Sequence, residues 1–429
     1  MRYTAISHPI TTRIFWPLIV TVVVSLILTV GCASTTRQTD STNDSKHDKA
    51  VADSLHEAYL LQLSKQWSSA WDHYRNKNYR DALHPFWKVV ELDTIQRFKN
   101  VYTLLSDAYA QLNRPDSAEL VMELGIREYP DNAHMHRTFA FYLTRRGKVE
   151  AAIQEYETTV KIDSTRKDDW KVLGQLYVKI SRIDDAIRAY ETVTRLDRAD
   201  QEPHLVLSSL YRTRGNEQAA INQMEAVKKL DPDNAENLFR LGKAYFEQAN
   251  YSQAIINFQM LLKVKPRHLV GLEYLGASQQ NNREINSALV TYQTILTLQP
   301  DNKKIMTDVA ACYKELGKFP TAKNFTDKAL VIDSTYGLAH IVRGEIFEAA
   351  AEECIRRMGK KIPEFDDKLV FEMAYKEYQK AALDSQFKDM ANERLNNIQD
   401  FIPTKEDLFF NKGKTKPLDA CYDWIFQSL

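Results

Sequence analysis

The chain has 429 residues, and its 57 Lys and Arg residues equal its 57 Asp and Glu residues, so the formal net charge is zero. This balance lacks the basic excess typical of nucleic-acid-binding proteins, and we expect no nucleic-acid partner. The four cysteines form no Cys-x2-Cys pair and have no histidine at metal-ligand spacing, so we expect no metal site. No phosphate-binding Gly-x4-Gly-Lys motif occurs, and we expect no cofactor.

The first 31 residues are organised like an export signal. Arg2 and Arg13 precede an uncharged, mostly apolar run over residues 14–30, which ends at Gly31 and Cys32. The segment resembles a bacterial lipoprotein signal peptide, and the resemblance implies cleavage before Cys32 and lipid attachment to Cys32. The alternative is an uncleaved anchor, because the run is near the lower length limit for crossing a bilayer. Both readings predict a membrane-anchored envelope protein, as a periplasmic or outer-membrane lipoprotein in the first case.

A polar segment and an incomplete repeat come next. Residues 32–57 are rich in Ser, Thr, Asp and Lys and poor in large apolar residues, which predicts a flexible tether. Residues 58–98 hold a poor copy of the repeat that follows, marked by Ala70, Ala82 and Phe86. A terminal repeat is expected to be atypical, because one of its faces has no neighbour.

Residues 99–336 repeat one pattern seven times at a spacing of 34 residues. Such a period is the signature of stacked units, none of which buries its apolar face alone. The small residues of the pattern are Ser106, Ala140, Gly174, Ser208, Gly242, Gly276 and Ala310. Its alanines are Ala118, Ala152, Ala186, Ala220, Ala254, Ala288 and Ala322. The clearest copy consists of Trp170, Leu173, Gly174, Tyr177, Ala186 and Tyr190.

This copy resembles the tetratricopeptide repeat family, whose pattern is Trp-x2-Leu-Gly-x2-Tyr followed by Ala-x3-Phe. The resemblance implies two antiparallel helices per repeat and an all-α, right-handed superhelical solenoid of about nine helix-turn-helix repeats. The residues support helices independently, because large apolar groups recur at three- and four-residue spacing, as at Leu238, Leu241 and Tyr245. A glycine inside a helix costs about 1 kcal/mol, so we expect Gly242 to mark a close approach to a large side chain such as Phe258.

Residues 337–400 are predicted to form an enlarged ninth unit. The pattern restarts at Gly344, but its alanine, Ala374, arrives eighteen residues later than in the other copies. A breaker segment over residues 358–363 is expected to separate two longer helices. Apolar periodicity over residues 388–399 predicts a capping helix.

Residues 401–429 form an aromatic C-terminal tail, in which Thr404 and Asp407 can cap a short helix. The tail is too rich in aromatic residues for a solvated segment, so we expect it to fold back onto the last repeats. Docking onto a partner is the alternative. In an exported protein Cys312 and Cys354 can pair as a disulfide or remain buried small hydrophobes, and spacing does not decide between these.

No Gly-x-Ser-x-Gly or His-Glu-x-x-His motif is present, and we expect no enzyme activity. The family resemblance implies that the first helix of each repeat lines a concave groove. Its binding positions correspond to Arg137, Phe141, Arg145, Lys171, Lys179, Arg212, Phe239, Lys243 and Phe246. This run of cations and phenylalanines suits an acidic peptide with apolar anchors.

The sequence therefore predicts a non-enzymatic scaffold of the bacterial cell envelope, which binds partner proteins or peptides in the groove. Lipoproteins of similar build serve in outer-membrane protein assembly, pilus biogenesis and peptidoglycan-enzyme recruitment, and the residues do not choose among these settings. The alternative is a self-assembling structural protein whose C-terminal tail docks into the groove of another copy. The oligomeric state stays open.

Overall fold

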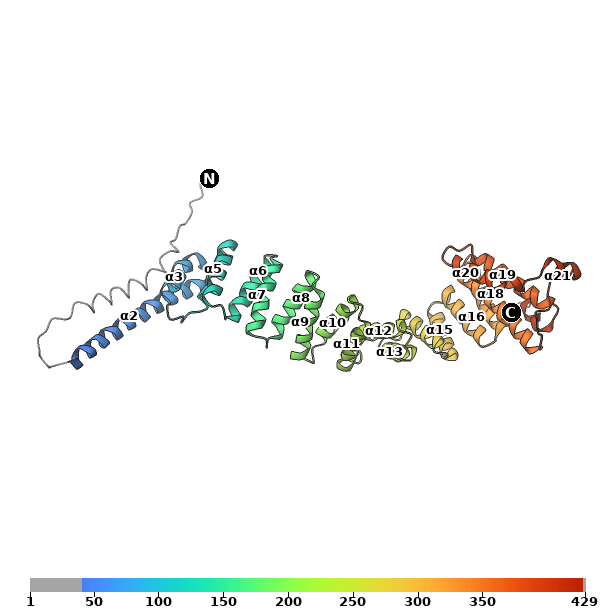
Figure 1. The fold of residues 1–429 in the computed structure, drawn as a ribbon, viewed down its shortest axis with the longest axis horizontal. Coiled ribbons are helices and arrows are strands. Elements are labelled where there is room, and N and C mark those ends of the chain that lie inside the picture. The colour runs from blue at the N-terminus through green and yellow to red at the C-terminus, as the bar shows by residue number, and fades with distance from the viewer. Residues whose placement is uncertain (1–40, 427–429) are drawn as a thin grey trace, which may run out of the picture. The chain divides into compact units, whose positions relative to one another are not determined.

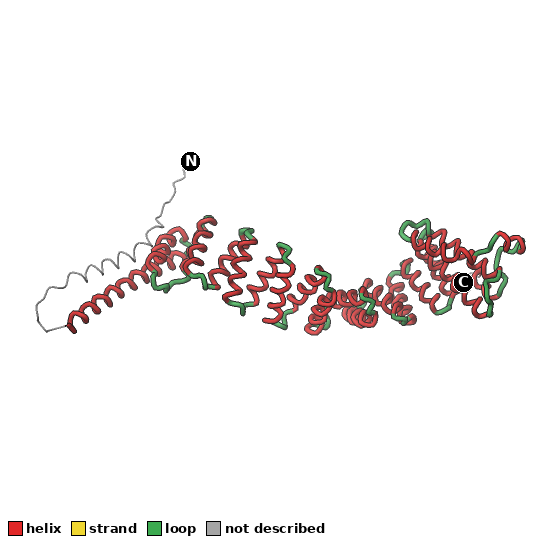
Figure 2. The backbone as a smooth tube through the Cα atoms, in the orientation of Figure 1, coloured by secondary structure: helices red, strands yellow, loops and turns green. Residues whose placement is uncertain are grey.

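The computed structural model describes residues 41–426, and every regular element within that range is a helix. Figure 2 accordingly shows only helices and loops. The predicted all-α architecture is confirmed for this part of the chain. None of the helices described combines the length and the apolar character that crossing a bilayer requires. The expected signal peptide and Cys32 lie outside the described residues.

Between residues 41 and 381 the helices form nine successive pairs, each joined by a short turn and packed together. This confirms the predicted number of helix-turn-helix repeats. The pairs are α2 (Ser41–Arg75) with α3 (Tyr79–Leu92), α4 (Val101–Gln111) with α5 (Pro115–Glu128), α6 (Ala133–Arg145) with α7 (Val149–Ile162), α8 (Lys167–Lys179) with α9 (Ile183–Leu196), α10 (Gln201–Thr213) with α11 (Glu217–Leu230), α12 (Ala235–Glu247) with α13 (Tyr251–Val264), α14 (Leu269–Asn281) with α15 (Ile285–Leu298), α16 (Lys303–Glu315) with α17 (Phe319–Ile332), and α18 (Gly337–Arg357) with α19 (Phe365–Ala381).

The chain divides into two compact units, with the boundary between Pro130 and Asp131. The first unit contains α2 to α5, and the second begins at α6. Within each unit, the second helix of one pair packs against the first helix of the next pair. Figure 1 shows this sequential stacking of pairs along the second unit. Each repeat therefore gains most of its core from its immediate neighbours.

Helix α2 corrects one prediction. The sequence predicts a flexible tether over residues 32–57, yet α2 begins at Ser41 and runs without a break to Arg75. The side chains of residues 47–58 are exposed, so this part of α2 has no packed face. Good helix formers such as Ala50 and Leu55 extend the helix outward from its packed turns around Leu63. The composition indicates that these residues bury no apolar side chains. Residues that bury no apolar side chains can still be helical.

Trp67 packs against the core of the first unit, whereas Trp71 is 39% exposed. The ring of Trp67 stacks on that of Phe98 at a centroid distance of 4.4 Å and meets the edge of Phe86 at 6.1 Å. Phe86 is fully buried. These contacts explain why the atypical first repeat is stable with its neighbour on one side only, because aromatic rings bury large apolar areas.

Glycines in the second unit lie where two helices approach closely. A Cβ atom at Gly174 would lie 2.8 Å from the ring of Tyr190, and one at Gly242 would lie 2.8 Å from the ring of Phe258. Gly276 is tighter still, at 2.4 Å from the ring of Tyr292. In each case the aromatic residue follows the glycine by sixteen positions and comes from the second helix of the same pair. The predicted close approach is confirmed.

Gly276→Ala is expected to destabilise the chain by about 1–3 kcal/mol, because the new methyl group overpacks against Tyr292. Helix propensity alone would make the same substitution stabilise the chain by about 1 kcal/mol. The two effects have opposite signs, so the midpoint of urea unfolding decides between them. In a Tyr292→Leu background, which removes the ring, the cost of Gly276→Ala should largely disappear. A higher midpoint for Gly276→Ala in the wild-type background would contradict this packing.

The enlarged ninth pair keeps the same contact across its insertion. Gly344 of α18 lies against Tyr378 of α19, where a Cβ atom would be 2.4 Å from the ring. The two residues are 34 positions apart instead of sixteen, because the extra eighteen residues lengthen both helices and the connection at residues 358–364. The pair is followed by α20 (Lys388–Ile398) and by the short helices η1 (Gln399–Phe401), α21 (Lys405–Phe410) and η2 (Ala420–Phe426).

The C-terminal tail folds back onto its own chain. In η2, Tyr422 is fully buried and Ile425 is 4% exposed, and both belong to the core of the α18–α19 pair. The ring of Trp424 lies 6.3 Å from that of Phe319 and 6.3 Å from that of Phe347. The tail therefore docks in cis over residues 420–426. The predicted cap at Thr404 is confirmed, since its side chain accepts a hydrogen bond from the N–H of Asp407.

The disulfide joins Cys354 to Cys421, whereas the sequence leaves open a pair of Cys312 with Cys354 or two buried small hydrophobes. Cys312 is free and fully buried in the core around α15 and α16, so the interpretation as a small hydrophobe holds for this cysteine. Cys354 instead lies near the end of α18, where the returning tail brings Cys421 to a Cα separation of 6.1 Å.

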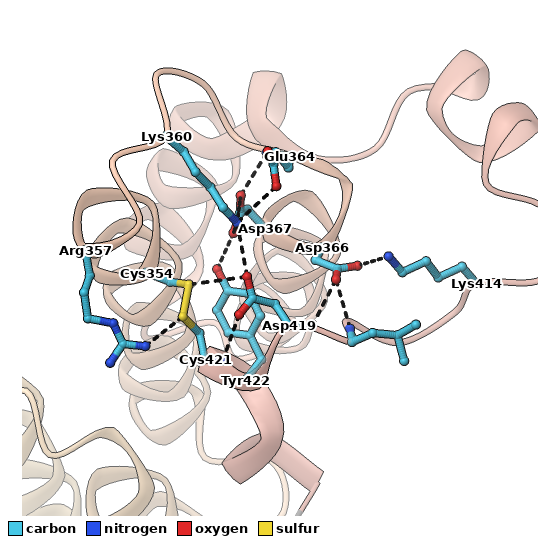
Figure 3. Close-up of polar contacts among 11 residues, drawn as sticks. Cys354, Arg357, Lys360, Glu364, Asp366, Asp367, Lys414, Asp419, Cys421 and Tyr422 are labelled. Atoms are coloured by element: carbon cyan, nitrogen blue, oxygen red, sulfur yellow. Dashed lines mark hydrogen bonds and ion pairs between the residues drawn. A yellow bond between two sulfur atoms is a disulfide. The ribbon is translucent and has the colours of Figure 1, made fainter.

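Two carboxylates at the start of α19 hold the tail in place (Figure 3). Asp367, which is fully buried, accepts a hydrogen bond from the Tyr422 hydroxyl at 2.5 Å and forms an ion pair with Lys360 at 3.1 Å. Asp366 accepts hydrogen bonds from the backbone N–H groups of Leu418 and Asp419, at 3.0 and 3.1 Å. Burial without such partners would be costly for either carboxylate.

Candidate functional site

The first helices of successive repeats lie side by side in the second unit and form one face, which we call the first-helix face. Ion pairs connect neighbouring first helices along it. Arg137 of α6 binds Asp169 of α8 with two nitrogen atoms, at 2.7 and 2.6 Å. Further along, Lys304 of α16 contacts Glu273 of α14 at 3.0 Å. The face is therefore a continuous surface on which a partner can contact several repeats.

Four of the predicted cations have carboxylate partners. Asp169 is 3% exposed, and its hydrogen bonds raise the pKa of Arg137 above its ordinary value, with burial opposing. Lys171 contacts Glu202 of the next repeat at 2.5 Å. The remaining two pairs are longer: Arg212 lies 3.6 Å from Glu217, and Lys243 lies 3.5 Å from Glu247. These partners reduce the positive field that the sequence predicts for the groove.

Two of the predicted phenylalanines pack between repeats. Phe239 contacts the rings of His268 and Tyr274, at centroid distances of 5.2 and 6.0 Å. Phe246 meets Tyr274 edge-on at 5.3 Å. Both phenylalanines are half-buried, and they contribute to the core around α12 and α13. Phe239 and Phe246 therefore hold neighbouring repeats together, although they lie on first helices.

Phe141, Arg145 and Lys179 remain available on the first-helix face. Phe141 is 56% exposed, and the guanidinium of Arg145 lies 5.9 Å from the centre of its ring. Arg145 and Lys179 are exposed, and neither has a carboxylate within 4.0 Å among residues 41–426. They occupy the same repeat position, in the last turns of α6 and α8. A ring and two cations that are unpaired within residues 41–426 therefore lie on neighbouring first helices.

Comparison with known families identifies the repeats. Residues 100–132, 172–235 and 236–267 each match a family model of the tetratricopeptide repeat. These three segments are tetratricopeptide repeats. No curated protein matches the chain.

Several solved structures are similar to parts of the chain at low sequence identity. MamA is 20% identical over 40% of this chain and 94% of its own, with a TM-score of 0.33. A tetratricopeptide repeat protein from Parabacteroides merdae is 16% identical over 62% of this chain and 98% of its own, with a TM-score of 0.33. YrrB, described as a tetratricopeptide protein with an unusual peptide-binding site, is 18% identical over 42% of this chain and 93% of its own, with a TM-score of 0.34.

Three tyrosine–glutamate hydrogen bonds connect successive tetratricopeptide repeats. Tyr177, Tyr211 and Tyr245 are 34 residues apart, and each donates to a glutamate twenty positions earlier, at 2.7, 2.6 and 3.0 Å. Burial and the bonded glutamate raise the pKa of Tyr211 and of Tyr245 to about 12. These hydroxyls stay protonated in ordinary conditions, so the bonds fix the spacing of repeats and do not supply an acid or base for catalysis.

Carboxylates also lie on the first helices of the last repeats, which the sequence interpretation missed. Lys304 contacts Asp308 at 3.4 Å, and burial raises the pKa of Asp308, with the Lys304 charge opposing. Further along α18, burial and the neighbouring Glu348 raise the pKa of Glu352. Glu345 is neutralised by Lys314 and by Arg394, each at 2.5 Å. The repeat register locates these carboxylates, because they lie on first helices like the predicted cations.

One group of possible metal ligands occurs within the described residues, formed by Cys354, Asp419 and Cys421. The two sulfur atoms are joined to each other, so neither is available as a thiolate ligand. The group therefore belongs to the tail attachment.

An array of tetratricopeptide repeats with a continuous helix face supports a protein-interaction scaffold.

Proposed function

We propose that the chain is a non-enzymatic scaffold of the bacterial cell envelope, which binds a segment of a partner protein on the first-helix face at Phe141, Arg145 and Lys179. The observation that carries this proposal is the exposed Phe141 ring beside Arg145, with Lys179 at the corresponding position of the next first helix and no carboxylate near either cation among residues 41–426. Elsewhere on the face, the predicted cations are paired and the predicted phenylalanines are half-buried. This location is therefore the part of the predicted strip that keeps free binding capacity.

The partner segment should carry an apolar or aromatic side chain next to acidic residues. An exposed ring offers apolar area for an anchor residue. The two cations attract carboxylates and fix the register of the segment. Because Arg145 lies on α6 and Lys179 on α8, a segment that contacts both must span two repeats.

Placement in the envelope is supported by two observations. The N-terminal residues resemble a lipoprotein signal with Cys32 as the lipid-attachment residue. The Cys354–Cys421 disulfide is typical of proteins in an oxidising compartment, since cytosolic thiols are usually kept reduced. A lipid at Cys32 would hold the array at a membrane surface, where it would meet its partners.

The double change Arg145→Glu and Lys179→Glu is expected to remove the partner without unfolding the array. The measurement is cross-linking in intact cells, followed by affinity capture and mass spectrometry. A matched control is Lys161→Glu with Lys263→Glu, which makes the same charge change at exposed last-turn positions of second helices. A cross-linked partner lost from the first variant and kept in the control supports the proposal. An identical set of partners in both variants would remove it.

The alternative function, self-assembly through the tail, is disfavoured by one observation. Residues 420–426 are packed into their own chain, with Tyr422 fully buried and Cys421 bonded to Cys354. Docking of this segment into another copy would require breaking both attachments.

A further inference from the structure

The tail carries an exposed apolar patch, which we define as Leu408, Phe409, Phe410 and Leu418. These side chains are 50%, 61%, 74% and 75% exposed. Leu408, Phe409 and Phe410 are consecutive in α21, which lies at the outer edge of the α18–α20 cluster in Figure 1. Exposed apolar residues that gather on one segment mark an interaction site more often than scattered ones do.

The patch is held rigidly at its base. The Thr404 capping box starts α21, and Asp407 of that box is bound by Lys368 of α19 at 2.7 Å. At the other end, Lys414 contacts Asp366 at 2.5 Å, and Figure 3 shows both Asp366 and its contacts with the tail. The segment is thus fixed on two sides, and its apolar side chains point away from the core that fixes it.

Three lysines of the same tail segment as the patch have no carboxylate partner among the described residues. Lys405, Lys412 and Lys416 are exposed, and none has a carboxylate within 4.0 Å in the part of the chain that the structure describes. Lys412 lies 4.4 Å from the centre of the Phe409 ring, and Lys416 lies 5.0 Å from that of Phe426. Glu406 is the exposed carboxylate of the segment, since Asp407 is paired with Lys368.

We propose that the tail patch binds an anionic lipid surface. Aromatic and aliphatic side chains that enter the headgroup region, flanked by lysines that contact anionic headgroups, are the features of interfacial membrane segments. A protein partner fits less well, because lysines are depleted in protein–protein interfaces and three of them stand here around four apolar residues. The patch is also a projection instead of a groove, so it suits insertion into a soft surface.

The test uses the full chain with Cys32→Ser and one added cysteine, which carries an environment-sensitive fluorophore. Thr415→Cys places the fluorophore at the patch, and Asn222→Cys places it at an exposed position of α11 as the control. The probes are vesicles of phosphatidylcholine with phosphatidylglycerol and vesicles of phosphatidylcholine alone, both containing a nitroxide-labelled lipid as quencher. Cys312 is buried and the other two cysteines form the disulfide, so labelling is confined to the added residue.

We expect anionic vesicles to quench the fluorophore at 415 and not the one at 222. Leu408→Ser with Phe409→Ser and Phe410→Ser should abolish this quenching while leaving the unfolding midpoint unchanged, because these side chains are exposed. Lys405→Glu with Lys412→Glu and Lys416→Glu should abolish it as well, since each lysine near such a surface contributes about fivefold in affinity. Equal quenching at both positions, quenching that survives the serine changes, or capture of a protein through the patch without quenching would overturn the proposal. The assay does not involve the first-helix face, so its outcome is independent of the function proposed above.

Discussion

A chain with Cys354→Ser and Cys421→Ser is expected to lose about 4 kcal/mol of stability in its C-terminal repeats. The disulfide closes a loop with a sequence separation of 67 residues, and a loop of this length restricts the unfolded chain by roughly that amount. In the folded chain the same bond holds the last turns of α18 against the tail that buries Tyr422. Urea unfolding followed by far-ultraviolet circular dichroism measures the loss.

Reductant supplies the control for this prediction. Wild-type protein in dithiothreitol should unfold at the urea concentration of the double serine variant, and dithiothreitol should have no effect on the variant. Cys312 should not interfere, because burial raises the pKa of its thiol to about 12 and keeps it protonated. If reduced and oxidised wild-type protein unfold at the same midpoint, the disulfide contributes nothing to the folded tail.

The repeat period determines how much of the fold is predictable. A spacing of 34 residues places each helix and each small residue in register, so the contact between Gly174 and Tyr190 predicts the one between Gly276 and Tyr292. The same register survives the insertion in the ninth unit, where Gly344 meets Tyr378. The helix cap at Thr404 is also predictable, because it joins Thr404 to Asp407, which is close in sequence. These features depend on residues close in sequence or on exact repetition.

Features that depend on contacts outside the register were not predictable. Lys171 has its partner Glu202 on the next repeat, and no property of Lys171 itself distinguishes it from Lys179, which has no carboxylate partner in the part of the chain that the structure describes. Cys421 reaches Cys354 because the tail returns to α18, and the path of a tail is set by tertiary packing. Helix α2 extends over polar residues because a packed segment nucleates it, which composition does not reveal. The sequence therefore predicts the helix face on which the candidate site lies. The structure is needed to show which cations and rings on that face are available for binding.

Glu377→Gln is expected to destabilise the α18–α19 pair by about 3–5 kcal/mol. The Glu377 carboxylate accepts hydrogen bonds from His340 at 2.7 Å and from Arg343 at 2.6 Å, and both partners come from α18. The side chain of Glu377 is 9% exposed and that of Arg343 is 16% exposed. Removing the negative charge leaves the Arg343 cation buried with Asp327 as its remaining counter-charge, at 3.0 Å. Urea unfolding at neutral pH measures the effect.

The matched control is Glu372→Gln on the same helix, whose ion pair with Lys376 is more exposed and worth at most about 1 kcal/mol. Acid gives a second test of the same network. Burial raises the pKa of Glu377, but the hydrogen bond from His340 and the charge of Arg343 outweigh it and lower the pKa from 4.5 to about 2. A lowered folded-state pKa means that the stabilisation is complete above the unfolded value of 4.5 and is lost as the pH falls toward 2. The wild-type chain should therefore lose stability between about pH 4.5 and pH 2 more steeply than Glu377→Gln, and parallel pH profiles would show that the Glu377 charge is not what holds the two helices together.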